Sequence, residues 1–138
     1  MKSRLLAALA ALLVSVAPAF AARTDLTVQT PVNLNSSISA NAADLASTAG
    51  DASNGNQFVM SGGEIIIAKN SGASARTITI TSAPDNLGRT KDITTYSIGA
   101  GETAIFGPFQ AYGWRQSNGK GYIDVSNAEV LLSVYRAQ

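Results

Sequence analysis

The chain has 138 residues, the size of one domain, with ten Lys or Arg against nine Asp or Glu. It contains neither His nor Cys, which excludes Ser-His-Asp and Cys-His catalysis within one chain, disulfides and thiolate metal sites. No cluster of Lys or Arg provides the basic field that attracts nucleic acid. The composition therefore favours a structural or binding protein without catalysis or a cofactor.

Residues 1–21 have the pattern of a secretory signal peptide. Two basic residues, Lys2 and Arg4, precede an apolar run from Leu5 to Val16, and Ala19-Phe20-Ala21 supplies a small-residue cleavage pattern. The apolar run is too short for a comfortable transmembrane helix. We expect an apolar leader helix, cleaved after Ala21, and no membrane contact afterwards. The alternative is a helix that stays attached as an anchor.

The mature chain begins with a predicted N-terminal arm over residues 22–34. Its strand is "TDLTVQ", in which Leu26 and Val28 share one face. The arm residues are Thr24, Asp25, Leu26, Thr27, Val28 and Gln29. Residues 35–56 are rich in Ala, Ser and Asn and lack a broad apolar face, so we expect a surface excursion there.

The remainder reads as short strands separated by Gly, Asn, Ser and Pro. In 76–82 the alternation predicts Ile78 and Ile80 inward and the threonines outward. Turn residues predict that 70–74 forms a hairpin, that strand 92–98 folds back on 102–107, and that 126–129 tightly links the last two strands. Further strands are expected at 64–70, 122–127 and 129–137. We therefore expect an all-β fold: a single antiparallel β-sandwich, jelly-roll-like or β-tulip-like, of about seven to eight strands over residues 22–138.

Residues 101–127 hold the only Trp and several other aromatic residues. Ile105 is expected in the core, and Gly107-Pro108 is expected to end its strand, because proline cannot donate to a ladder. The aromatic side chains beyond are predicted to form either a hydrophobic lid or a contact surface. The predicted interface residues are Leu26, Val28, Phe109, Tyr112, Trp114, Arg115 and Tyr122. Trp114, Tyr112 and Tyr122 also suit a carbohydrate-binding module.

Acidic residues give no specific sign of chemistry. The loop from Asp51 to Glu64 lacks the ligand spacing of an EF-hand, although an irregular calcium site stays open. No spacing singles out a pair of carboxylates for general acid and base catalysis. We expect no catalytic residue and no metal site.

A series of short motifs, in order, resembles a family of small tailed-phage virion proteins, the capsid decoration or cement-like proteins. The motifs are "LTVQ" (26–29), "ASTAGD" (46–51), the apolar strand 63–70, the Thr/Ile strand 77–81, the Gly-rich turn 99–102, Gly-Pro-Phe (107–109), 121–125 and the closing strand 130–136. Together they cover nearly all of residues 24–137.

The resemblance implies a non-enzymatic domain on the virion surface, whose partners are copies of itself and a major capsid protein. It also implies that the N-terminal arm pairs with capsid protein or a neighbouring subunit. The leader departs from this family. If it is used, the protein is periplasmic or extracellular, and the alternative is a subunit of a secreted filament or surface coat that assembles by N-terminal strand exchange.

Overall fold

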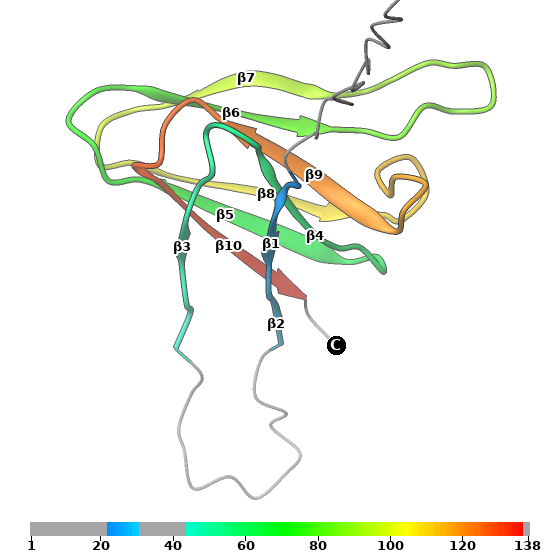
Figure 1. The fold of residues 1–138 in the computed structure, drawn as a ribbon, viewed down its shortest axis with the longest axis horizontal. Coiled ribbons are helices and arrows are strands. Elements are labelled where there is room, and N and C mark those ends of the chain that lie inside the picture. Colours follow the sequence, from blue (N-terminus) through cyan, green and yellow to red (C-terminus); the bar gives the residue numbers. More distant parts are fainter. Residues whose placement is uncertain (1–21, 31–43, 137–138) are drawn as a thin grey trace, which may run out of the picture.

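The computed structural model describes residues 22–30 and 44–136, which form ten strands in two sheets (Figure 1). Sheet A has the order β1 (Thr24–Leu26), β4 (Asn56–Val59), β9 (Lys120–Val125), β6 (Arg76–Thr81) and β7 (Ile93–Ile98). Sheet B has the order β2 (Val28–Gln29), β10 (Val130–Arg136), β5 (Glu64–Asn70) and β8 (Thr103–Phe109), and β3 (Thr48–Ala49) also pairs with β10. The described residues contain no helix.

One apolar core joins the two sheets. Ile78 and Ile80 are buried in sheet A, as their alternation predicts, and they belong to the same cluster as Ile66 and Leu132 of sheet B. Alternating residues point to opposite faces of a strand, so each strand contributes every second side chain to this core. The expectation of an all-β chain is confirmed.

The two sheets are mixed, so the expected purely antiparallel arrangement is wrong. β1 runs parallel to β4, with Leu26 opposite Phe58, and β2 runs parallel to β10, with Val28 opposite Val134. The other pairs are antiparallel. The expected count of seven to eight strands falls short of ten, because the predicted N-terminal strand is divided into β1 and β2, and the short strands β3 and β4 were not predicted.

Most connections between successive strands cross from one sheet to the other. Residues 70–74 join β5 to β6, and 126–129 join β9 to β10, so neither is a link between paired strands. The expectation that 92–98 folds back on 102–107 is also wrong, since β7 lies in sheet A and β8 in sheet B. Among successive strands, β6 and β7 form a hairpin. Turn residues predict a reversal of direction, but they do not specify which sheet the next strand enters.

The buried Asn70 holds two of these crossings together. Its Nδ2 lies 2.8 Å from the carbonyl oxygen of Ser74 and 3.0 Å from those of Ile98 and Gly99, and its Oδ1 accepts the Gly72 N–H at 2.9 Å. The side chain thereby satisfies backbone groups of both the β5–β6 and the β7–β8 connections. Buried carbonyl groups without such a donor would be costly.

β8 differs from its prediction in two ways. The strand continues through Gly107 and Pro108 to Phe109, and Ile105 is 68% exposed, whereas Phe106 is buried. A register shift against β5 lies between the pairings of Phe106 and Phe109. A bulge of this kind changes the alternation, so Phe106 and Phe109 both face the core although they are three residues apart. Ile105 precedes the bulge, and alternation with the buried Phe106 places it on the outer face.

Some predictions fall outside the described residues. These are the leader helix over 1–21, the end of the N-terminal arm at 31–34, and the first part of the surface excursion at 35–43. Residues 44–49, the next part of the predicted excursion, are exposed and include β3.

Candidate interaction surfaces

The N-terminal segment spans both sheets within its own chain. β1 extends the edge of sheet A and β2 pairs with β10 of sheet B, with the exposed Thr27 between them. Leu26 is 6% exposed and belongs to the core, and the half-buried Val28 packs against it. Leu26 and Val28, which the sequence predicted to share one face of the arm, therefore anchor the segment through apolar contact.

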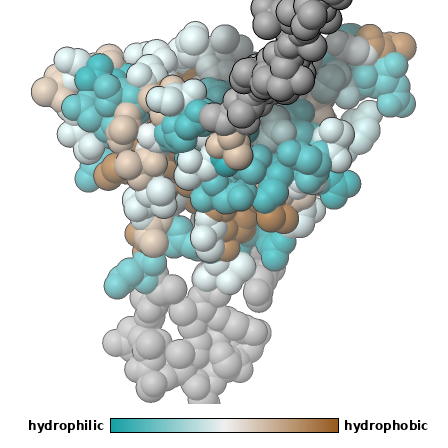
Figure 2. Space-filling view, viewed as in Figure 1, coloured by the Kyte–Doolittle hydropathy of each residue, from teal (hydrophilic) through white to brown (hydrophobic). Residues whose placement is uncertain are grey.

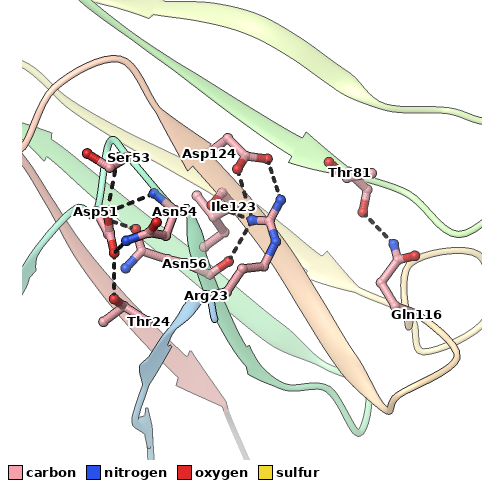
Figure 3. A network of polar contacts seen from close by, with 10 residues as sticks. All are labelled: Arg23, Thr24, Asp51, Ser53, Asn54, Asn56, Thr81, Gln116, Ile123 and Asp124. Carbon is pink, nitrogen blue, oxygen red and sulfur yellow. Dashed lines mark hydrogen bonds and ion pairs between the residues drawn. The ribbon is translucent and has the colours of Figure 1, made fainter. Parts of the chain in front are cut away.

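Arg23 fixes the start of this segment (Figure 3). Its Nη1 lies 2.9 Å from Oδ1 of Asp124 and donates to the carbonyl oxygens of Asn56 at 3.2 Å and Ile123 at 3.3 Å. The guanidinium carbon also lies 4.4 Å from the ring centroid of Tyr122. Since an arginine makes planar, multiple hydrogen bonds and also stacks on aromatic rings, one side chain here ties β1 to both β4 and β9.

Further polar contacts hold the segment along its length. Thr24 donates its hydroxyl proton to Asp51 at 2.8 Å, and Lys120 pairs with Asp25 at 2.8 Å. The Gln29 side chain accepts the N–H of Ala46 at 2.8 Å and donates to its carbonyl at 2.7 Å. The hydrogen bond from Lys120 lowers the pKa of Asp25. The predicted arm is thus docked in its own chain by specific side-chain contacts.

The loop that carried the calcium hypothesis has a different organisation. Asp51 accepts hydrogen bonds from the backbone N–H groups of Ser53 and Asn54, in addition to the Thr24 hydroxyl. The Asn54 N–H, followed by the Thr24 hydroxyl, lowers the pKa of Asp51 to about 2. In the described part of the chain, no three acidic side chains gather as metal ligands would. The geometry of this loop is that of a turn stabilised by its own aspartate.

The predicted aromatic interface residues separate into distinct environments. Phe109 is buried and packs edge-on against Trp114, with 4.6 Å between ring centroids. Tyr112 is 76% exposed, Arg115 is exposed, and Tyr122 lies on β9 beneath Arg23. The Phe109–Trp114 pair closes the core, which is the lid alternative for these two residues. The carbohydrate-binding alternative stays a prediction.

Tyr112 borders an open surface depression of about 300 Å³. Its other lining residues are Ala83, Asp85, Arg89, Thr90, Lys91 and Gly113. Asp85 organises this loop: it accepts the N–H groups of Leu87 and Arg89 and pairs with the Arg89 side chain at 2.7 Å. Figure 2 shows hydrophobic residues at the tip of the loop between β6 and β7, and further hydrophobic residues in the lower middle of the described surface.

The outer faces of the two sheets differ sharply in polarity. In sheet A, threonines 77, 79 and 81 lie beside Tyr122, Asp124 and Ser97. In sheet B five outward positions of β5, β8 and β10 form what we call the apolar outer face. Its residues are Ile65, Ile67, Ile105, Leu131 and Tyr135, which are half-buried except for the exposed Ile105. The other outward positions of these strands hold Lys69, Thr103 and the buried Ser133. The sequence signal for this face was the continuous apolar run of 64–70.

Two groups with clear structural roles were not predicted from the sequence. Arg23 is 101 residues from Asp124, so local patterning does not reveal the pair. Glu64 is fully buried. Burial raises its pKa, but the hydrogen bonds that it accepts from Ser61 and Gly62 lower the pKa by more than burial raises it. The pKa of Glu64 therefore lies below the ordinary value. The alternation of β5 would have shown that Glu64 faces the core alongside Ile66.

Comparisons with protein-family models, curated proteins and solved structures find no match to this chain. Within residues 22–30 and 44–136, no helix has the length and hydrophobicity needed to span a membrane.

Proposed function

We propose that this chain is a non-enzymatic structural protein, a β-sandwich of jelly-roll-like or β-tulip-like type that works as a subunit of a larger assembly. The specific form we propose is a phage capsid decoration or minor virion protein, located on the virion surface. Its partners would be copies of itself and a major capsid protein. The family resemblance supports the virion assignment, and the apolar outer face of sheet B is the observation that carries the assembly function.

The outward positions of the two sheets carry different kinds of side chain. An antiparallel or mixed sheet with one solvated face normally alternates apolar inward and polar outward residues. In sheet A the outward residues of β6 follow that rule, because they are threonines, and Val59 of β4 is an exposed apolar exception. Sheet B breaks it at three isoleucines, Ile65, Ile67 and Ile105, which face away from the core. Ile105 is 68% exposed, and Ile65 and Ile67 are half-buried. Apolar side chains gathered on an outer face are typical of surfaces that another molecule covers.

Capsids that lack this chain provide the test. The full chain should bind them, and Ile67→Thr should bind at least about tenfold more weakly, because a polar group replaces apolar contact. Val59→Thr is the matched control, since Val59 is 58% exposed on β4 of the opposite sheet. Absence of the chain from purified virions, or equal binding by Ile67→Thr and wild type, would contradict the proposal.

A second candidate is an exported filament or surface-coat subunit, and the docking of residues 24–29 favours it. This terminal segment pairs with both sheets through short parallel contacts and specific side chains, as a donated strand does. Exported material should begin at Ala22 or Arg23 by mass spectrometry and form fibres in negative stain. A chain found only in virions would exclude this candidate.

A further inference from the structure

β8 is an edge strand with free main-chain groups. Within residues 22–30 and 44–136, it lies at the end of sheet B and pairs with β5 alone. Asn70 donates its N–H to Glu102 at 2.9 Å, and the register continues with Ala68 opposite Ala104 and Ile67 opposite Ile105. Bonded and non-bonded pairs alternate along an antiparallel ladder, so the N–H and C=O groups of Thr103 and Ile105 point away from β5.

This edge lacks the usual protection against pairing over its first half. Edge strands are commonly blocked by charged side chains, bulges or proline. The other sheet has such protection at β7, where Thr95 has a φ of 47° and the register against β6 shifts. β8 carries no charged residue from Thr103 to Phe109, and its bulge and Pro108 lie beyond Phe106. Residues 103–106 are therefore a regular, uncharged edge.

We propose that β8 pairs antiparallel with β8 of a second copy of this chain, about a two-fold axis at Ile105. The proposal deepens the assembly function above and rests on it. The two Ile105 residues would face each other as a hydrogen-bonded pair and exchange both of their main-chain hydrogen bonds. Such an isologous contact uses the same surface of both copies and closes at two subunits.

The strand is self-complementary in this register. In the regular part of the edge, Ala104 stands opposite Phe106 of the second copy, so a large side chain meets a small one. Thr103 comes opposite Gly107, where the bulge begins. No like charges oppose each other along residues 103–107. Ile105 is also part of the apolar outer face, so pairing would join the outer faces of both copies into one continuous surface. These properties favour a second copy over an unrelated strand.

The contact should be weak when it acts alone. An edge of four or five residues buries less than the roughly 1,000 Å² of a stable specific interface. We therefore expect a dimer that forms with increasing concentration, and stronger association where many copies are held together on a surface.

Sedimentation equilibrium of the full chain tests the proposal directly. Wild type should dimerise, and Ile105→Glu should weaken the dimer at least about tenfold, because two carboxylates then face each other across the axis. Val59→Glu, the same change at an exposed valine of β4 between β1 and β9, should leave the dimer unchanged. The fluorescence of the single tryptophan, Trp114, reports whether each variant is folded.

Mixing oppositely charged variants tests the two-fold axis. Ile105→Glu and Ile105→Lys should each be monomeric, but a mixture should form a heterodimer, since unlike charges would meet at the axis. The chain has no native cysteine, so Ile105→Cys should also form a disulfide-linked dimer under mild oxidation, whereas Val59→Cys should not.

Three results would overturn the proposal. A wild-type chain that stays monomeric, a dimer that tolerates Ile105→Glu, or a charge-swapped mixture that fails to associate would each exclude this pairing. If wild type is monomeric but Ile105→Glu abolishes binding to capsids, the edge takes a strand of another protein instead. If the chain binds capsids regardless of Ile105, the assembly function stands and the β8 contact is excluded.

Discussion

Replacement of Asn70 by Asp tests whether this one side chain holds the two inter-sheet connections together. The two residues have nearly the same shape, but aspartate has no N–H donors. A carboxylate oxygen would face the carbonyl oxygens of Ser74, Ile98 and Gly99, which now lie 2.8 to 3.0 Å from Nδ2. The contact with the Gly72 N–H would remain, because it needs only an acceptor.

The expected loss follows from the hydrogen bonds. The amide nitrogen carries two protons, and each buried carbonyl left without a donor costs about 1–3 kcal/mol, so the variant should lose about 2–6 kcal/mol. A domain of this size has a total stability of about 5–15 kcal/mol. The loss is therefore a large fraction of the free energy of unfolding.

Urea unfolding followed by Trp114 fluorescence measures this loss, because that ring packs on Phe109 at the core. With a slope of about 2 kcal/mol/M, the midpoint should fall by about 1–3 M. Asn127→Asp is the control: Asn127 Oδ1 accepts the N–H of Glu129, a role that aspartate can fill. An Asn70→Asp variant within about 0.5 kcal/mol of wild type, the range of ordinary surface changes, would refute the reasoning.

Three further predictions concern other parts of the fold. Gly121→Ala should lower the free energy of unfolding by about 1–3 kcal/mol in the same urea assay, since a Cβ there would lie 2.5 Å from Cζ of Phe58. Asp51 has its pKa lowered to about 2 in the folded state, so its contribution to stability is present above its ordinary pKa and is lost as pH falls towards 2. Acid titration should therefore show a shallower loss of stability below pH 4 in Asp51→Asn, and an unchanged profile would contradict the role of this turn. Arg23→Ala should speed amide hydrogen exchange of Leu26 more than that of the central strands, because the start of β1 loses its contacts; equal exchange would show that Arg23 does not hold the strand.

The sequence predicted local features of the fold well. Alternation placed Ile78 and Ile80 in the core, because the two faces of a strand repeat every two residues regardless of what the strand pairs with. Alternation also identified the strand at 76–81, and a continuous apolar run identified the strand at 64–70. The docking of Leu26 and Val28 on the core also follows from their shared face.

The candidate interaction surfaces could be predicted only in part. The sequence identified Leu26, Trp114 and Tyr122 as candidate interface residues, but it did not predict which residues they contact. Arg23 reaches Asp124 and Tyr122 only because β1 lies beside β4 and β4 beside β9. Likewise, Ile105 was expected inside, but it pairs with the outward Ile67 and alternates with the buried Phe106, so it faces out.

The sequence by itself determined an all-β chain, its strand-forming segments and the absence of His and Cys chemistry, since these depend on composition and on periodicity within a few residues. Tertiary structure alone decided which strands pair. It placed β7 and β8 in different sheets, made the N-terminal strands parallel, and left β8 as an uncharged edge. Pairing is decided by contacts between distant residues, such as those of Asn70 with Ile98, and a local pattern carries no information about them.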